Sequence, residues 1–185
     1  MKIEANHTDE RSTGKDRFPE VTTTEEGIPI IIRPIGPEDK SRVAKLLRSL
    51  SPRSIYLRFF CHMRDFPDPM IHRLTHIDSR NEIVLVALDL SGNMLGKSTV
   101  CVMGDEKHAE FAVLVADDWQ GKGIGAALLK RCLMLAKARG IETVWGRVLG
   151  ENTQMLALGK KLGFVRRRVP DSCEYDLLFE MNKPA

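Results

Sequence analysis

Apolar residues in this chain recur at two different spacings, which divide it into extended and helical segments. Residues 29–33 hold three consecutive isoleucines next to a proline, a composition typical of a short strand. Residues 36–50 begin with Gly-Pro-Glu-Asp, which suits a helix start, and continue with apolar residues at helical spacing. The pattern predicts a second helix over residues 51–60 and a third, short one over residues 69–75.

The second half of the chain alternates between strand-like and helical patterns. Three apolar, β-branched runs separated by turn residues predict an antiparallel meander. The predicted order is strands at 83–90, 97–103 and 110–115, a helix at 123–139, a strand at 143–148, a helix at 152–162, and strands at 164–169 and 175–180. This order predicts an α/β (α+β) fold in which helices flank a mixed, mostly antiparallel central sheet.

The first 27 residues lack such a pattern. They are rich in Glu, Thr, Lys and Asp and contain only isolated apolar residues. A segment of this kind buries too little apolar surface to offset the entropy lost on ordering. We therefore expect a flexible tail over residues 1–27 and a single domain over residues 28–185.

Composition and charge narrow the class of protein. The chain has 43% hydrophobic and 29% charged residues, an ordinary globular balance, and its net charge of +3 is too small to indicate a nucleic-acid partner. No run approaches the roughly 18 to 20 apolar residues of a membrane-spanning helix, and residues 1–11 lack the apolar core of a signal peptide. We expect a cytoplasmic protein that uses neither nucleic acid nor membrane as a partner.

The four cysteines give no sign of a metal site. Cys61, Cys101, Cys132 and Cys173 are far apart, form no Cys-x-x-Cys pair and have no closely spaced histidine partner. The expectation is four reduced thiols and no bound metal.

A glycine-rich turn at residues 119–126, Trp-Gln-Gly-Lys-Gly-Ile-Gly-Ala, is the most specific local feature. It joins a predicted strand to a long predicted helix, where glycines allow close backbone approach and the first N–H groups of the helix attract a phosphate. A connection with no ligand would also explain three glycines. A dinucleotide-binding fingerprint does not fit, because the third glycine comes one residue early and the next strand carries Trp145, Gly146 and Arg147 where an acid is required.

The turn and a second motif resemble the GNAT superfamily of N-acetyltransferases. Gln120, Gly123 and Gly125 match its Gln/Arg-x-x-Gly-x-Gly/Ala signature. The residues of the next predicted helix that follow the superfamily's second pattern are Asn152, Met155, Leu158, Lys161, Gly163 and Phe164. The resemblance spans residues 30–180 and implies a sheet with splayed central strands and acetyl-CoA as the acetyl donor.

Within that superfamily the chain resembles the acetyltransferase domain of bacterial protein-lysine acetyltransferases. The similarity rests on Arg-Pro-Ile-x-Pro-Glu-Asp at residues 33–39, on the segment 50–60 that ends in Arg58-Phe59-Phe60, and on Ala-Glu-x-Ala at residues 109–112. The Arg-Phe-Phe segment has a second interpretation, in which both phenylalanines are core residues and the arginine is solvated.

The resemblance also implies where the cofactor lies. Pantetheine would enter the gap between the strands that end near Val115 and Val148, as an additional strand. The residues expected to bind the cofactor, by backbone N–H groups along the strand and around the pyrophosphate, are Val113, Leu114, Val115, Gln120, Gly121, Lys122, Gly123, Ile124, Gly125 and Ala126. Asn152 either contacts pantetheine or only caps its own helix.

Glu110 resembles the glutamate that acts as general base in the protein-acetylating branch. Strand alternation places it on one face with Ala112 and Leu114, and the alternative is a solvated glutamate on an edge strand. Many members carry a tyrosine that protonates the leaving thiolate, but this chain has Gly159 there, so the general acid stays unassigned.

The resemblance therefore implies an N-acetyltransferase, whose acceptor we expect to be a lysine side chain of another protein. A small-amine acetyltransferase, acting on a polyamine or antibiotic, shares every cofactor feature, and a non-catalytic acyl-CoA-sensing module would account for Gly159. The basic residues 166–168, with Lys160 and Lys161, would contact an acidic substrate, contact the CoA 3′-phosphate, or form a solvated strand face.

Overall fold

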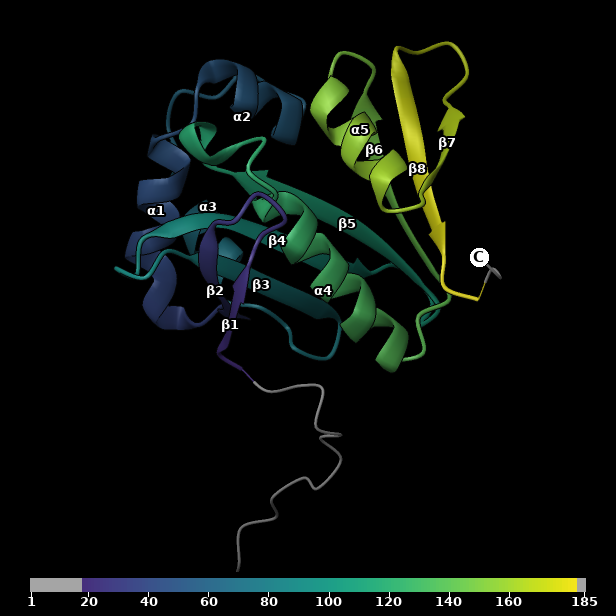
Figure 1. Ribbon diagram of the computed structural model, residues 1–185. Coiled ribbons are helices and arrows are strands. Elements are labelled where there is room, and N and C mark those ends of the chain that lie inside the picture. Colours follow the sequence, from purple (N-terminus) through teal and green to yellow (C-terminus); the bar gives the residue numbers. More distant parts are fainter. Residues whose placement is uncertain (1–17, 183–185) are drawn as a thin grey trace, which may run out of the picture.

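The computed structural model describes residues 18–182, which build one eight-stranded sheet. The strand order is β1-β2-β3-β4-β5-β6-β8-β7, and every neighbouring pair is antiparallel except β5 and β6, which are parallel (Figure 1). The strands are β1 (Glu20–Thr23), β2 (Pro29–Pro34), β3 (Glu82–Leu88), β4 (Met94–Val102), β5 (His108–Val115), β6 (Thr143–Leu149), β7 (Val165–Arg168) and β8 (Glu174–Glu180). The predicted mixed, mostly antiparallel sheet flanked by helices is confirmed.

Helices cover both faces of this sheet. The helices are α1 (Lys40–Arg48), α2 (Pro52–Phe59), α3 (Asp68–Thr75), α4 (Ile124–Ala138) and α5 (Thr153–Lys161), with short 3-10 turns at Pro37–Asp39 and Asp117–Trp119. Figure 1 shows α4 lying across the sheet on one face and α1 to α3 on the other. None of the helices described is long and apolar enough to cross a membrane.

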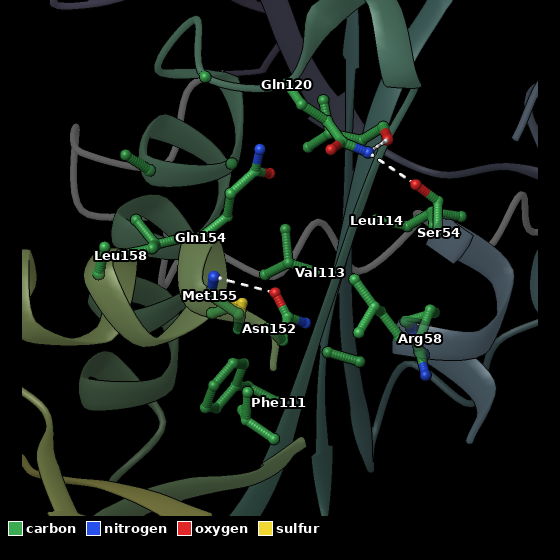
Figure 2. Close-up of a pocket in the computed structure, with 18 of the residues that line it drawn as sticks. Ser54, Arg58, Phe111, Val113, Leu114, Gln120, Asn152, Gln154, Met155 and Leu158 are labelled. Atoms are coloured by element: carbon green, nitrogen blue, oxygen red, sulfur yellow. Dashed lines mark hydrogen bonds between the residues drawn. The ribbon is translucent and has the colours of Figure 1, made fainter. Parts of the chain in front are cut away.

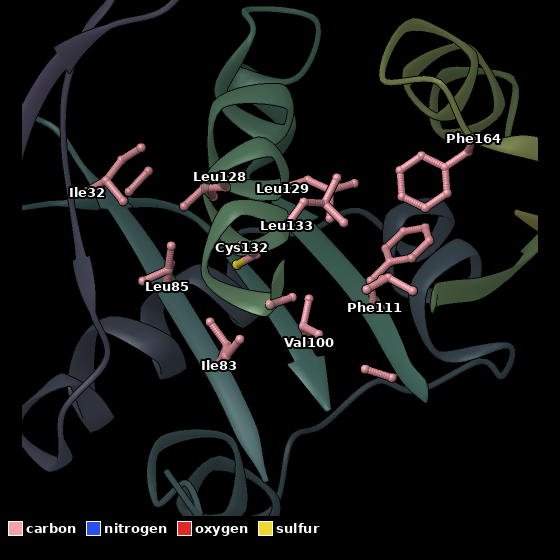
Figure 3. Packing of buried hydrophobic residues seen from close by; sticks show 14 of the residues in the cluster. Ile32, Ile83, Leu85, Val100, Phe111, Leu128, Leu129, Cys132, Leu133 and Phe164 are labelled. Atoms are coloured by element: carbon pink, nitrogen blue, oxygen red, sulfur yellow. The ribbon is translucent and has the colours of Figure 1, made fainter. Parts of the chain in front are cut away.

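Two apolar cores result, one on each side of the sheet. The larger lies between the sheet and α4, where Leu85 and Val100 lie under Leu128 and Cys132, while Phe111 packs against Phe164 (Figure 3). The smaller lies under α1 to α3. Because residues of one strand alternate between the faces, β5 contributes to both cores.

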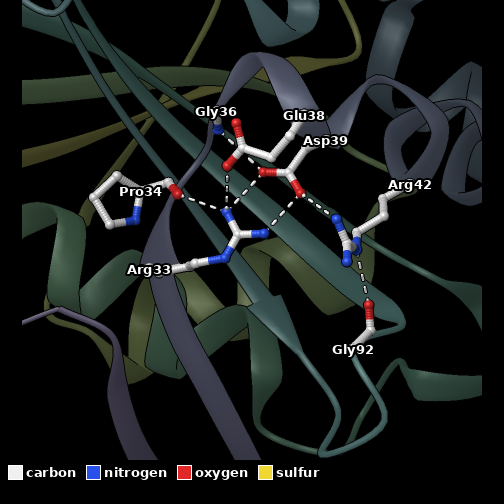
Figure 4. A network of polar contacts seen from close by, with 7 residues as sticks. All are labelled: Arg33, Pro34, Gly36, Glu38, Asp39, Arg42 and Gly92. Carbon is white, nitrogen blue, oxygen red and sulfur yellow. Dashed lines mark hydrogen bonds and ion pairs between the residues drawn. The ribbon is translucent and has the colours of Figure 1, made fainter.

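An ion-pair network attaches the start of α1 to β2. The Asp39 carboxylate is fully buried and accepts hydrogen bonds from both terminal nitrogens of Arg33, each at 2.7 Å, and from the Gly36 N–H at 3.0 Å, while Arg42 approaches at 3.2 Å (Figure 4). Burial by itself raises the pKa of Asp39, but these donors outweigh it and hold the pKa below its usual value. The Arg-Pro-Ile-x-Pro-Glu-Asp segment therefore has a structural role.

The predicted boundary at residue 28 is wrong for residues 18–27. Strand β1 pairs with β2 along its whole length, from Glu20 opposite Ile32 to Thr23 opposite Pro29. Its central Val21 is 71% exposed, so backbone pairing and the 3.0 Å ion pair of Glu20 with Arg131 of α4, rather than apolar burial, hold the strand in place. Residues 1–17 of the predicted tail lie outside the described residues.

The pairing of β5 with β6 is brief and defines the central gap of the molecule. Only His108, Ala109 and Glu110 have partners on β6, the last of them Trp145. From residue 111 to residue 115 the edge of β5 that faces β6 has no partner strand in the described part of the chain, and Figure 1 shows the two strands diverging toward α2 and α5. The implied splayed strands are confirmed.

Candidate active site

A pocket of about 490 Å³ occupies the gap between β5 and β6. Its walls come from α2, strand β5, the glycine-rich turn and helix α5 (Figure 2), together with strand β6 and the turn between β1 and β2. This volume is within the range of small-molecule sites. The residues of β5 that line the pocket are Glu110, Phe111, Ala112, Val113, Leu114 and Val115.

Most of the residues that the sequence proposed for binding or catalysis lie together around this pocket. Those that line it are Glu110, Val113, Leu114, Val115, Gln120, Gly121, Gly123, Gly125, Ala126 and Asn152. Two do not line it. The Lys122 ammonium lies over the Trp119 ring, 4.6 Å from its centroid, and Ile124 is 1% exposed within the core.

The glycine-rich turn brings the first turn of α4 to the pocket wall. Gly121 and Gly123 have φ values of 72° and 78°, the left-handed region that favours glycine, and Gly123 is the N-cap of α4. The N–H groups of residues 124–126 have no intrahelical acceptors at this position, so they form an anion-attracting group at the positive end of the helix.

Gln120 connects this turn to α2. Its side-chain nitrogen donates hydrogen bonds to Ser54 Oγ at 3.1 Å, to the Val115 carbonyl at 3.2 Å and to Asp117 Oδ1 at 3.1 Å (Figure 2). Asp117 in turn accepts a 2.8 Å bond from the Ser51 N–H, at the N-cap of α2. The Gln120 side chain therefore fixes the turn and the start of α2 relative to each other.

Asn152 caps α5 and lines the pocket at the same time. Its carboxamide oxygen accepts the Met155 N–H at 3.1 Å (Figure 2). Its carboxamide nitrogen makes no hydrogen bond to a described residue. Asn152 therefore caps α5, while its carboxamide nitrogen is left over for a ligand, so a contact with pantetheine stays a prediction.

Glu110 stands where β5 leaves β6. It is the last residue of β5 with a partner on β6, and on the other side it is opposite Cys101 of β4. Glu110, Ala112 and Leu114 share the face that looks toward α2, as predicted from strand alternation. The Glu110 carboxylate is half-buried, lines the pocket and accepts no hydrogen bond from a described residue.

Helix α2 supplies pocket residues that sequence reasoning did not assign. Phe59 packs on the smaller core, as the solvated-arginine interpretation required, but Phe60 is 39% exposed and lines the pocket beside Arg58. Arg58 is half-buried rather than solvated, and burial lowers its pKa while the charge of Glu110 opposes that shift. The Arg-Phe-Phe motif pointed to these residues in the sequence. Helical periodicity alone could not show which face of α2 lines the pocket between β5 and β6.

Gly159 lies where α5 packs closely on the last strands. A β-carbon at this position would come within 2.6 Å of Leu177 Cδ1, so the glycine permits the close approach of α5 to β8. Gly159 does not line the pocket.

The turn between β1 and β2 closes one side of the pocket with acids. The Glu26 carboxylate packs against Gly123, and a β-carbon added there would overlap it. Neighbouring Glu25 forms a 2.6 Å ion pair with Lys161 on α5, which also lines the pocket. Two carboxylates therefore lie beside the anion-attracting start of α4.

The basic strand β7 lies away from this pocket. Its four residues, including Arg166, Arg167 and Arg168, are exposed, and Arg166 lies over the Tyr175 ring. The strand is therefore exposed to solvent, and of the basic residues that the sequence grouped with it, Lys161 lines the pocket.

No metal centre is present in the described range: no group of three or more histidine, cysteine, aspartate or glutamate side chains there is placed to hold an ion. Cys132 is fully buried, which raises the pKa of its thiol to about 12. Cys61 and Cys173 are exposed.

Comparison with known proteins identifies relatives over most of the chain. Residues 50–164 match the model of the acetyltransferase (GNAT) family. An acetyltransferase of Pseudomonas aeruginosa is 30% identical over 154 residues, which cover 82% of this chain and 83% of that protein.

Solved structures show the same architecture. The GNAT domain of S. lividans PAT superimposes with a TM-score of 0.80 at 26% identity, over 87% of this chain and 96% of that one. A spermidine N-acetyltransferase from Vibrio cholerae, solved with CoA and spermine, gives a TM-score of 0.67 at 20% identity, over 83% of this chain and 96% of that one.

Proposed function

Because the chain belongs to the acetyltransferase (GNAT) family, we propose that it transfers the acetyl group of acetyl-CoA to a lysine side chain of another protein. The observation that carries this proposal is the position of Glu110. Its carboxylate lines the pocket at the point where β5 and β6 separate, five residues before the strand reaches Val115 and the glycine-rich turn.

The residues present fit acetyl-CoA, which is the acetyl donor of this family. The free edge of β5 from residue 111 to 115 supports pantetheine as an added strand, through backbone N–H and C=O groups. The first turn of α4 suits a pyrophosphate, and the free carboxamide nitrogen of Asn152 adds a donor on the opposite wall. The Glu26 carboxylate must move for a phosphate to reach Gly123.

Glu110 supplies the proton acceptor that such a reaction needs. A lysine side chain has an ordinary pKa of about 10.4, so it is almost wholly protonated at neutral pH and cannot attack a thioester. The Glu110 carboxylate accepts that proton as the amine nitrogen attacks the acetyl carbonyl. The two strands splay at this point, so the amine reaches the thioester from the α2 side while pantetheine lies along β5.

The charge around the pocket argues against a polyamine acceptor. Arg58 lines it without an ion pair to a described residue and Lys97 lies buried behind it, so a molecule with several ammonium groups meets repulsion at these two cations. Arg147, by contrast, is paired with Asp176. The overall resemblance to protein-lysine acetyltransferases, including the Arg-Phe-Phe segment of α2, favours a protein acceptor.

The proposal is tested by comparing different acceptor amines in assays of the full chain. Acetyl-CoA is incubated with lysine-containing proteins and peptides, with polyamines and with aminoglycosides, and CoA release and product mass are measured. We expect the highest kcat/KM for lysine in a protein or peptide. A polyamine or antibiotic as the best acceptor would overturn the protein assignment, and tight CoA binding without turnover on any amine would identify a sensing module.

A further inference from the structure

Among the described residues, Arg58 differs from the other cations that line the pocket in forming no ion pair. Among described residues, three cations line the pocket. Arg147 is bound to Asp176 through contacts of 3.0 and 3.3 Å, and Lys161 to Glu25 at 2.6 Å. The Arg58 guanidinium contacts the Phe59 ring at 5.1 Å but forms no hydrogen bond or ion pair with any described residue.

A second buried cation lies close to it. Lys97, on β4 opposite Leu114, is 8% exposed and donates a 2.9 Å hydrogen bond to the Leu74 carbonyl. Burial, and next the charge of Arg58, lower the pKa of Lys97 to about 8. The two cations are therefore near enough to repel each other.

The acids of this layer do not balance that charge. Glu82 is already engaged, because Arg73 binds it through contacts of 2.7 and 3.3 Å. Among the described residues, Glu110 is the acid whose charge acts on Arg58. Glu82, which Arg73 already holds, is the described acid whose charge acts on Lys97. A desolvated cation without a partner costs free energy, so this side of the pocket favours an anion.

We propose that Arg58 binds a carboxylate of the acceptor, so that this chain prefers amines that carry a carboxylate close to the amine. The inference rests on the proposed acetyl transfer at Glu110. Such an acceptor is matched at both ends: its amine lies at Glu110 and its carboxylate pairs with the planar guanidinium through two parallel N–H···O bonds. Figure 2 shows Arg58 on α2, across the pocket from Asn152 and α5.

The reaction balances with this arrangement. The acceptor amine gives its proton to Glu110, its nitrogen forms a bond to the acetyl carbon, and the carbon–sulfur bond breaks. The nitrogen, which was an ammonium before it gave its first proton to Glu110, loses a second proton as the amide forms. The leaving CoA thiolate takes up one of these two protons to become the thiol, and the other is released to water, which leaves Glu110 deprotonated again. The carboxylate on Arg58 is unchanged throughout, so Arg58 is a specificity residue rather than a catalytic one.

Two sources offer this chemistry: a lysine followed by an acidic residue in a peptide, and a free α-amino acid. Each is tested as a matched pair. Peptides with Lys-Glu are compared with the same peptides carrying Lys-Gln, and α-amino acids are compared with their carboxamides. The readout is kcat/KM for wild type, Arg58→Gln, Arg58→Lys and the exposed control Arg48→Gln.

We expect wild type and Arg48→Gln to prefer the carboxylate member of at least one pair by about 10-fold, mainly through KM. Arg58→Gln should lose this preference, and Arg58→Lys, which keeps the charge but not the planar fork, should retain part of it. The pair that shows the preference identifies the source.

Equal rates on both members of every pair in wild type, or an undiminished preference in Arg58→Gln, would overturn the inference and leave amine acetylation standing. Absence of acetylation of every amine by wild type would overturn the proposed function, and this inference with it. Melting temperatures verify that both Arg58 variants are folded.

Discussion

The two halves of the pocket are built in different ways. The cofactor half, at the glycine-rich turn and along β5, presents mostly backbone groups, and its shape depends on positive φ angles at Gly121 and Gly123. The other half, under α2, is the one that we propose for the acceptor and is called the acceptor half below. It presents side chains: Arg58 and Glu110, with Lys97 buried behind them. The binding properties of the cofactor half depend on backbone conformation, and those of the acceptor half depend on side-chain charge.

This difference separates what the family shares from what the individual chain selects. A backbone cradle tolerates many sequences as long as its glycines remain, and it binds the same pyrophosphate in each. Arg58 and Glu110 in the other half belong to neither apolar core, so substituting them should leave the fold in place. Substitutions in the cofactor half should therefore abolish binding, whereas those in the acceptor half should alter rate, acceptor choice or pH dependence.

The largest effect is expected in the cofactor half. Gly123→Asp should weaken CoA binding by at least about 100-fold, since it adds negative charge at the phosphate site and the new side chain overlaps Glu26. Gly140→Asp is the matched control, because Gly140 has φ 81° at the other end of α4 and open space around it. Calorimetry in which both variants bind CoA like wild type would refute the assignment of the turn.

Substitutions of Gly125 separate the effect of side-chain size from the effect of negative charge at the phosphate site. A β-carbon there would make only ordinary contacts, the nearest at 3.4 Å from Val113, so Gly125→Ala should bind CoA nearly as wild type does. Gly125→Asp places a carboxylate in the first turn of α4 and should abolish binding. If Ala and Asp weaken binding equally, sterics rather than phosphate repulsion would explain the requirement for glycine.

In the acceptor half, Glu110→Gln should lower turnover about 100-fold while CoA affinity stays close to wild type. Glutamine keeps the size of the side chain but accepts no proton. Raising the pH should partly restore the rate, because a larger fraction of the acceptor amine is then already neutral. The exposed control Glu106→Gln should leave turnover unchanged. Near-normal turnover of Glu110→Gln at neutral pH would remove the base from the mechanism.

The sequence predicted the cofactor half better than the acceptor half for a physical reason. A glycine-rich turn before an amphipathic helix is local, and alternation along β5 placed Glu110 on the correct face. The position of Arg58 depends on how α2 packs over β5, which involves residues more than fifty apart in sequence. No periodic pattern reports that packing.

The contact of the β1–β2 turn with the pocket was missed for a related reason. Strand β1 has a single apolar residue in its centre, Val21, which is exposed, so hydrophobic patterning gave no signal. Its stability comes from backbone pairing with β2 and from the ion pair of Glu20 with Arg131, and the sequence does not reveal which groups will pair. Because the sequence did not predict β1, it also did not predict that Glu25 and Glu26, in the turn after β1, lie beside the start of α4.

The stability of Lys97 variants tests whether the acceptor half carries excess positive charge. Its pKa in the folded protein is about 8, below the ordinary 10.5, so below pH 8 the folded state must bury a charged ammonium. Between pH 8 and 10.5 the unfolded chain binds more protons than the folded one, and stability should rise with pH across this window. Lys97→Met should therefore raise the free energy of unfolding by about 1 to 2 kcal/mol at pH 7, less the lost bond to Leu74.

That gain should shrink as the pH rises from 8 toward 10.5, because wild type then loses its burial penalty. Urea unfolding at several pH values measures it, with the exposed Lys137→Met as control. A Lys97→Met protein that is less stable than wild type at pH 7 would mean that the ammonium stabilises the fold, and the argument for excess positive charge in the acceptor half would fail.

The smallest effect concerns the acids that border the cofactor half. Glu26 lies against Gly123, and Glu25 holds Lys161, so both disfavour a phosphate at the start of α4. The double variant Glu25→Gln with Glu26→Gln should bind CoA about 3-fold more tightly at low salt, since it removes two negative charges near the site and releases Lys161.

The gain should fall as salt is added, because ions screen exposed charges within about 10 Å at 0.1 M. A control, Asp65→Asn with Glu106→Gln, removes the same net charge from exposed positions outside the pocket and should leave CoA affinity unchanged. If the control tightens binding equally, overall charge rather than the β1–β2 turn is responsible. If the Glu25 and Glu26 variant binds more weakly than wild type, these carboxylates contact the cofactor favourably, and the cofactor half then depends on side-chain charge as the acceptor half does.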